Sequence, residues 1–141
     1  MKILKKIIFS VFLFLLFMAI FFSTYVAVTF WQDDVLNEMA EKVKEGMALD
    51  EVVKIMGPWR YRIEIDPENT EKYGFLTALA IENLPSHKIQ EGEKYICLGY
   101  FLIAFRPARF RWYIAGTHVR VYLDSREKKV RHISTGFEIW D

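Results

Sequence analysis

The sequence predicts an α+β fold: an N-terminal transmembrane helix, then two short helices packed on a mostly antiparallel β-sheet of three to five strands. Three observations predict it. An uncharged apolar stretch lies near the N-terminus, two segments with helical periodicity follow it, and the later segments alternate or are continuously apolar as strands are. Helices that precede a group of strands are typical of a two-layer α+β domain.

Length and composition limit the classes of protein to which the chain can belong. A chain of 141 residues accommodates one small domain. Its formal net charge of +1 argues against a protein that binds nucleic acid through bulk charge. Its single cysteine, Cys97, excludes an intramolecular disulfide and a cysteine-cluster metal site, and we expect it to be a buried structural thiol.

The first predicted element is a transmembrane signal anchor over residues 7–31. The 25 residues from Ile7 to Trp31 carry no charge. As a helix they would be about 37 Å long, which exceeds the roughly 30 Å of a bilayer core. The alternative is a cleaved signal peptide. That alternative fits less well because the apolar run is long and Tyr25 stands where a cleavage site needs a small residue.

Charged residues flank this anchor asymmetrically and predict its orientation. Three lysines, Lys2, Lys5 and Lys6, precede it, whereas Asp33 and Asp34 follow it. The positive-inside rule therefore places residues 1–6 in the cytoplasm and residues 32–141 outside the inner (cytoplasmic) membrane.

Two helices are predicted next, over residues 33–45 and 49–56. In the first, Asp33 or Asp34 is expected to cap the N-terminus, and Gly46 follows its last turn. In the second, apolar residues recur at i, i+3, i+4 and i+7 from Leu49, and Gly57-Pro58 ends the helix.

The remaining residues predict the sheet. Residues 59–66 alternate as a half-buried strand, residues 70–84 are ambiguous, and residues 95–105 form an apolar run typical of a buried strand. Residues 106–109 are expected to turn, residues 110–115 and 117–124 to form two strands separated at Gly116, and residues 130–135 to form the last strand. The apolar residues 137–140 are expected to dock on the core or on a partner.

Three stretches in this order resemble the SmpA/OmlA (BamE-like) family of small envelope proteins. Gly46-Met47, Val52, Met56 and Gly57-Pro58 resemble its helix pair, residues 111–114 resemble one of its strands, and residues 119–124 with Val130 resemble its closing hairpin. The resemblance implies an α-α-β-β-β fold and a non-enzymatic scaffold role in outer-membrane assembly. Related small domains bind and inhibit β-lactamases. The chain departs from the family in lacking a lipid-attachment motif, in having Ala48 where a Ser/Thr helix cap is usual, and in its long 58–110 insert.

Two histidines are the only weak candidates for chemistry. If Asp124 pairs with Val130, Tyr122 faces His132 and Arg120 faces Ser134, so that one sheet face carries the residues His118, Arg120, Tyr122, Asp124 and His132. A metal site or an acid–base pair is one interpretation of this set. The alternative is the exposed polar face of a half-buried sheet. We predict no catalytic residue, no metal and no cofactor.

A group of arginines beside aromatic residues is the best candidate for binding. The predicted binding residues are Arg106, Arg109, Arg111, Trp112 and Arg120. Arginines interleaved with aromatics suit an acidic protein surface or anionic lipid headgroups. The alternative is a solvated strand face.

These observations predict a membrane-anchored, non-enzymatic protein-interaction module of the bacterial cell envelope. The expected partners are the lipid bilayer and an envelope protein, with no nucleic acid and no small-molecule substrate. One alternative is a membrane-proximal module that binds anionic lipid or peptidoglycan, and another is an unrecognised metal-dependent hydrolase that uses His118 and His132.

Overall fold

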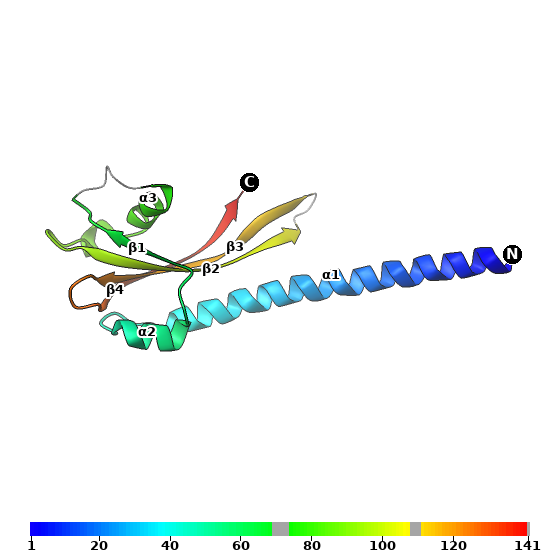
Figure 1. Ribbon diagram of the computed structural model, residues 1–141, viewed down its shortest axis with the longest axis horizontal. Coiled ribbons are helices and arrows are strands. Elements are labelled where there is room, and N and C mark those ends of the chain that lie inside the picture. The colour runs from blue at the N-terminus through cyan, green and yellow to red at the C-terminus, as the bar shows by residue number, and fades with distance from the viewer. Residues whose placement is uncertain (69–73, 108–110, 141) are drawn as a thin grey trace. The chain divides into compact units, whose positions relative to one another are not determined.

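A computed structural model describes residues 1–68, 74–107 and 111–140 of the protein. The chain divides into two compact units, Met1–Gln32 and Asp33–Asp141. Its elements follow the order α1, α2, β1, α3, a short 3₁₀ helix, β2, β3 and β4, which is the α+β class that the sequence predicts (Figure 1).

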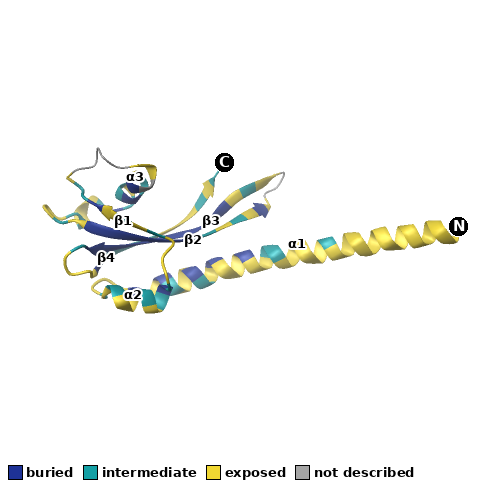
Figure 2. Cartoon of the chain, viewed as in Figure 1, coloured by how far each residue is buried: buried dark blue, intermediate teal, exposed yellow. Residues whose placement is uncertain are grey.

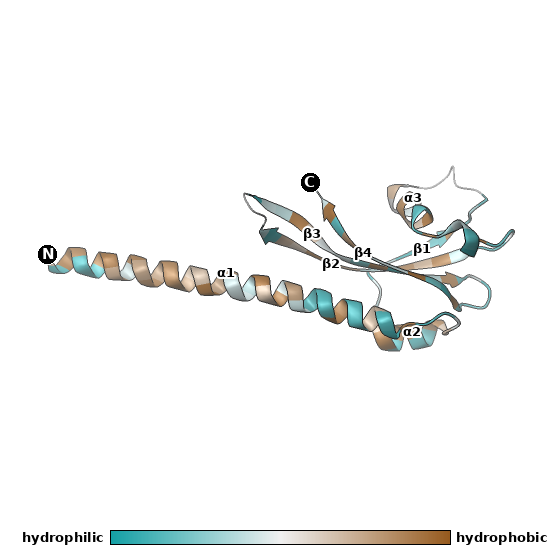
Figure 3. Ribbon diagram, turned by 180° about the vertical axis from the view of Figure 1, so that it is seen from behind, coloured by the Kyte–Doolittle hydropathy of each residue, from teal (hydrophilic) through white to brown (hydrophobic). Residues whose placement is uncertain are grey.

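The first element, α1, spans Lys2–Lys42. Its N-terminal part is long and apolar enough to cross a membrane, and the apolar residues form a continuous stretch along it (Figure 3). The prediction of separate helices over residues 7–31 and 33–45 was wrong, because Asp33 lies inside one continuous helix and does not cap a new one. The helix ends at Lys42, three residues before the predicted Glu45, so Gly46 does not stop it; Gly46, with a positive φ of 87°, lies in the turn that leads to α2.

Helix α2 spans Leu49–Met56, as predicted. Ala48 precedes it, and the Glu51 carboxylate accepts a hydrogen bond from the Ala48 backbone N–H, so half of a capping box forms without a Ser or Thr. Gly57 ends the helix with a φ of 76°. The apolar stripe faces the core, since Val52 and Met56 are buried.

Four antiparallel strands form one sheet in the order β1-β2-β3-β4. The strands are β1 (Tyr61–Ile65), β2 (Tyr95–Pro107), β3 (Trp112–Asp124) and β4 (Val130–Trp140). Gly116 was expected to separate two strands, yet it lies inside β3, paired with Ile103 on one side and Glu138 on the other. Ladders on both sides keep this position extended, so glycine alone does not break the strand.

The last strand extends beyond the predicted residues 130–135. Residues 137–140 continue β4 and pair with residues 114–117 of β3, so the apolar tail is part of the sheet. The strand expected to end at residue 105 likewise continues to Pro107. The rest of the predicted turn, residues 108 and 109, lies outside the described residues.

The ambiguous residues 70–84 include helix α3, which spans Phe75–Glu82. A 3₁₀ helix follows at Ser86–Lys88. Helices α2 and α3 lie on opposite faces of the sheet (Figure 1).

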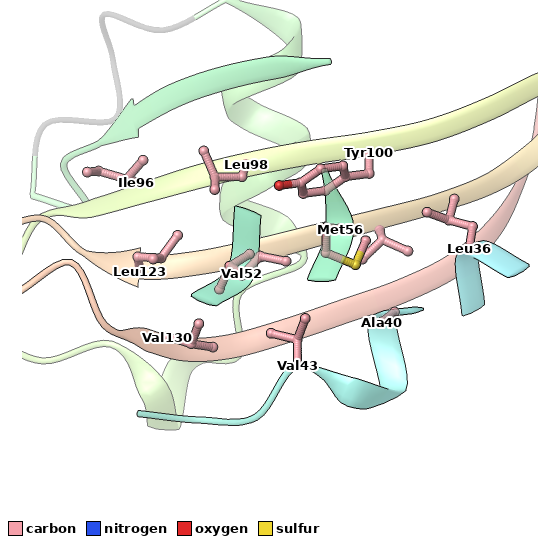
Figure 4. Packing of buried hydrophobic residues seen from close by; sticks show 12 residues of the cluster. Leu36, Ala40, Val43, Val52, Met56, Ile96, Leu98, Tyr100, Leu123 and Val130 are labelled. Carbon is pink, nitrogen blue, oxygen red and sulfur yellow. The ribbon is translucent and has the colours of Figure 1, made fainter. Parts of the chain in front are cut away.

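Each face of the sheet has its own apolar core. One core joins α2, the last turns of α1 and Val43 to β2, β3 and the start of β4 (Figure 4); it comprises Leu36, Ala40, Val43, Val52, Met56, Ile96, Leu98, Tyr100, Val119, Val121, Leu123 and Val130. The other lies under α3 and comprises Ile65, Ala80, Leu84, Tyr95, Cys97 and Tyr122. Burial is concentrated where these helices cover the sheet, whereas the far ends of β2, β3 and β4 are largely exposed (Figure 2).

Candidate functional site

Four polar side chains from three strands form a hydrogen-bonded set on the α3 side of the sheet, which we call the polar cluster. Its members are Tyr61 of β1, His118 and Arg120 of β3, and Glu138 of β4. Tyr61 Oη lies 2.7 Å from His118 Nε2. His118 Nδ1 lies 3.1 Å from Glu138 Oε2. Arg120 Nη2 donates to Glu138 Oε1 at 2.7 Å.

The donors and acceptors of the polar cluster relate the tautomer of His118 to its partners. A carboxylate only accepts, so the contact with Glu138 requires His118 to donate from Nδ1 and to accept at Nε2 from the Tyr61 hydroxyl; Arg120 Nη2 also lies 3.2 Å from Nδ1, where it would donate to the other tautomer. Both nitrogens of a neutral imidazole are then used. Burial, together with the nearby Arg120 charge, lowers the pKa of His118 and favours this neutral form.

The other members of the cluster keep fixed ionisation states near neutral pH. Burial opposes ionisation of Glu138, but hydrogen bonds from Arg120 and His118 outweigh it and lower the Glu138 pKa. Burial raises the pKa of Tyr61 to about 12, so its hydroxyl stays protonated. A protonated phenol and a fully hydrogen-bonded imidazole are poorly suited to nucleophilic catalysis. These side-chain hydrogen bonds instead connect β1, β3 and β4 across the sheet.

Gly99 of β2 makes room for this arrangement. A Cβ atom at position 99 would lie 2.0 Å from ring carbons of Tyr61, so the ring occupies the space that a side chain would fill. Phe101 packs beside it, with ring centroids 6.3 Å from Tyr61 and 5.8 Å from His118. The absence of a side chain at Gly99 therefore lets Tyr61 reach across β2 to β3.

The predicted register of β3 and β4 is largely confirmed. Tyr122 pairs with His132 and Arg120 pairs with Ser134. Val130, however, pairs with Leu123 rather than Asp124, because a β-bulge shifts the register between Tyr122 and Leu123.

The expectation that this face is an exposed polar surface was wrong. His118, Arg120, Tyr122 and Asp124 are all buried. The reason is that β1 supplies Tyr61 and α3 supplies the Ala80 carbonyl, which accepts a hydrogen bond from Tyr122.

The two histidines do not form a joint site. His132 contacts the ring of Tyr122, at 5.8 Å between centroids, whereas His118 belongs to the polar cluster. Within residues 1–68, 74–107 and 111–140, no three His, Cys, Asp or Glu side chains are placed to hold a metal ion.

The predicted binding arginines separate into buried and exposed residues. Arg106 is 2% exposed, pairs with Asp33 of α1 and lies 5.2 Å from the ring centroid of Phe137. Arg106 and Arg120 are both internal, so the expectation that they lie on a binding surface was wrong for these two. Arg111 and Trp112 are exposed at the start of β3. Arg109 lies outside the described residues.

Exposed apolar side chains gather where β2 and β3 extend beyond the apolar core under α3. We call Ile103, Phe105, Trp112 and Ile114 the hairpin patch. Phe105 is 58% exposed and Trp112 is 51% exposed. Phe105 pairs with Ile114, and Trp112 pairs with Pro107. Since alternate residues of a strand share a face, these four side chains lie on one face of the hairpin.

The outer edge of β4 is a second exposed feature. β4 pairs with β3 on one side only. At the start of its outer side, Val130 exchanges backbone hydrogen bonds with Gly46 and Met47. No further backbone partner is present along that side among the described residues. We call residues 133–140 of this side the β4 edge.

Sequence reasoning missed the partners of the buried arginines. Asp33 was interpreted as a helix cap, Tyr61 only as an apolar strand residue, and Glu138 was not considered. One signal was available: Glu138 is the one charge between Ile133 and Trp140. A lone acid in an apolar strand is a candidate partner for a buried base.

Comparison with protein-family models, curated proteins and solved structures finds no match to this chain.

Proposed function

We propose that this protein is a membrane-anchored, non-enzymatic interaction module of the bacterial cell envelope. We further propose that it holds an extended segment of an envelope protein along the β4 edge. On the sequence motifs alone, we also propose a relationship to the SmpA/OmlA-like envelope domains.

The membrane part of the proposal rests on α1 and its flanking charges. The apolar stretch of α1 is long enough to cross a bilayer. Lysines precede it and Asp33 and Asp34 follow it, which favours a cytoplasmic N-terminus and an external folded unit at the inner membrane.

The observation that carries the interaction part is the contrast between the two edges of the sheet. The β1 edge is five residues long and presents Arg62 and Glu64, so it is short and charged, as protected edges are. β4 has eleven residues, and no proline interrupts them. Its one charge beyond Ile133, Glu138, is already engaged with Arg120. A long, unprotected edge is suited to accept another strand through its backbone groups.

Side chains along β4 support the same mode of binding. Phe137 and Ile139 are exposed on one face of the strand, where they can contact alternate residues of an added strand. The polar cluster favours a non-enzymatic role, because His118 and Arg120 are buried and the four side chains hydrogen-bond to one another.

Site-specific photocrosslinking tests this proposal. The full-length protein carries a photoreactive residue at Thr135, is irradiated in intact membranes, and its adducts are identified by mass spectrometry. We expect an adduct with an envelope protein whose crosslinked peptide is an extended segment. Ile139→Lys should abolish this adduct, because a charge on an edge strand opposes strand addition.

Phe75→Lys is the matched control. It makes the same apolar-to-lysine change at an exposed residue of α3, away from β4, and should leave the adduct intact. An adduct that survives Ile139→Lys, an adduct with only a second copy of this chain, or no adduct at all would each contradict the proposed partner.

A further inference from the structure

We propose that the segment bound along the β4 edge places an aromatic side chain, preferentially that of a tyrosine, over Gly136. This inference rests on the proposed function and deepens it, because it names the residue type by which the edge selects its partner. All the residues that carry it belong to the folded unit Asp33–Asp141.

Three glycines lie inside strands of the sheet, where glycine is unfavourable unless a close neighbour requires it. Two of them have such a neighbour within the chain. A Cβ atom at Gly99 would lie 2.0 Å from ring carbons of Tyr61, and a Cβ atom at Gly116 would lie 1.5 Å from the backbone oxygen of Leu102. Both glycines therefore make room for another part of the molecule.

Gly136, the third, has no such neighbour among the described residues. A Cβ atom there would meet none of their heavy atoms within 4 Å, its own chain neighbours aside. Its φ angle is not positive, and the β3–β4 register runs without a shift from His132 to Trp140. Gly136 is also exposed, on the strand whose outer edge is free beyond Ile133. A strand glycine that is neither in a bulge nor in a turn is suited to the close approach of another chain.

The pair Tyr61–Gly99 shows what kind of side chain such a position accepts in this sheet. The two residues lie directly opposite each other in the β1–β2 ladder, and the ring occupies the space beside the glycine. The Tyr61 hydroxyl thereby reaches the next strand but one, where it lies 2.7 Å from His118 Nε2. Aromatic residues opposite edge glycines are a recurrent stabilising pair, because the ring covers backbone that a side chain would otherwise protect.

A residue opposite Gly136 on an added strand would stand in a similar relation to β3. Gly136 pairs with His118, and Glu138 lies two residues further along β4 on the same face, with its side chain 28% exposed. The Glu138 carboxylate accepts hydrogen bonds from His118 and Arg120, and a carboxylate has acceptor sites for more. A tyrosine hydroxyl over Gly136 can therefore donate to Glu138, whereas phenylalanine lacks this donor.

The opposite face of the β4 edge determines the neighbouring positions of the partner. Phe137 and Ile139 are exposed there, so we expect apolar residues opposite both. In an antiparallel segment these residues stand one and three positions before the aromatic residue. The partner is thus an extended segment with the pattern apolar, any residue, apolar, aromatic.

Binding of defined synthetic peptides tests the inference. Fluorescent peptides of nine residues alternate threonine and valine and carry tyrosine, phenylalanine or alanine at the centre, so that they offer the same pattern in both chain directions. Fluorescence anisotropy with the full-length protein in detergent gives each Kd. We expect the tyrosine peptide to bind about tenfold more tightly than the alanine peptide, with the phenylalanine peptide between them.

Gly136→Val is the decisive variant. Valine suits a strand but fills the space over which the ring would lie, so the three peptides should bind this variant with equal Kd. Thr135→Val is the matched control, because it places the same side chain at the adjacent exposed residue on the opposite face and should preserve the preference for tyrosine. If the denaturant midpoint shows that Gly136→Val perturbs the fold, Gly136→Ala takes its place.

The outcomes separate this inference from the proposed function, with Ile139→Lys as a third variant. Equal binding of the three peptides to the wild type, or a preference for tyrosine that survives the substitution of Gly136, overturns this inference. If Ile139→Lys still weakens the binding of every peptide, strand addition at the β4 edge stands. Binding that Ile139→Lys leaves unchanged, or no binding of any peptide, contradicts both proposals.

Discussion

Gly99 is the residue on which the polar cluster most directly depends, because the Tyr61 ring lies where a side chain would be. In Gly99→Ala the new methyl group would meet ring carbons 2.0 Å away, so Tyr61 must move off His118. We expect the free energy of unfolding to fall by about 1–3 kcal/mol. Denaturant unfolding of the full-length protein in detergent, followed by near-ultraviolet circular dichroism, measures this loss.

Gly136→Ala is the control for this substitution. A Cβ atom there has no neighbour within 4 Å, and the φ angle of Gly136 is not in the positive range. Its effect should stay within about 0.5 kcal/mol. A loss as large as that of Gly99→Ala would show that any added methyl group destabilises this sheet, and would remove the special role given to position 99.

His118 makes stability depend on pH in a defined direction. Its pKa is lowered in the folded state, mainly by burial, so the unfolded chain binds a proton more readily. The stability that neutral His118 contributes is therefore complete above its unfolded-state pKa of about 6.5. It is lost as pH falls from that value toward the lower folded-state pKa. His132 shifts in the same direction. Glu138, whose pKa is lowered from 4.5, loses its contribution only in more acidic solution.

We accordingly expect the free energy of unfolding to fall between about pH 7.5 and about pH 5.5, and to fall less in His118→Gln. Adding His132→Gln should flatten the curve further. Unfolding curves for the three proteins across this range check the expectation. A slope that is unchanged in His118→Gln would mean that His118 does not titrate as the polar cluster requires.

At the scale of elements, we expect the contact between α1 and β2 to be the most sensitive to substitution, because it places a charge pair in the protein interior. Asp33→Asn removes the negative charge beside the buried Arg106 guanidinium, and we expect it to lower the free energy of unfolding by about 3–5 kcal/mol. The double variant Asp33→Leu, Arg106→Met removes both charges and should be less costly than the single one. Denaturant midpoints in detergent provide the comparison.

The pair Lys129–Glu127 is a suitable control for this prediction. Its charged atoms lie 4.0 Å apart and both side chains are more than half exposed. Glu127→Gln should change the free energy of unfolding by less than about 0.5 kcal/mol. If Asp33→Asn changes the free energy of unfolding by as little as Glu127→Gln does, the buried pair does not hold the helix to the hairpin.

Local sequence signals were sufficient to predict most helices and strands, but not the contacts between them. The limits of α2 could be predicted from the apolar stripe that begins at Leu49 and from Gly57, because both signals are local to the helix. The continuity of α1 through Asp33 could not be predicted, because its partner Arg106 is distant in the sequence. Gly116 and residues 137–140 were misjudged for the same reason: ladders to neighbouring strands override weak local propensity. The polar cluster likewise needs β1, whose pairing no local pattern specifies.

At the scale of the whole molecule, the orientation in the membrane is the testable property. We expect Glu127→Cys to react with a membrane-impermeant maleimide on intact cells, because residues 32–141 should lie outside the inner membrane. Cys97 should not react with the maleimide, since burial raises the pKa of its thiol to about 12. Labelling that requires lysis would place the folded unit in the cytoplasm and reverse the proposed topology.

The connectivity of the sheet also has a consequence for kinetics. Strands β2, β3 and β4 pair with their neighbours in the sequence, so these ladders join segments that are close along the chain. Hairpins of this kind form within about 1–10 μs, and local pairing lowers the contact order of a domain. The sheet can therefore be complete before any partner arrives. A partner strand would meet a rigid template, at the roughly 10⁵–10⁷ M⁻¹s⁻¹ typical of preformed surfaces, and the partner alone would bear the entropy of becoming ordered.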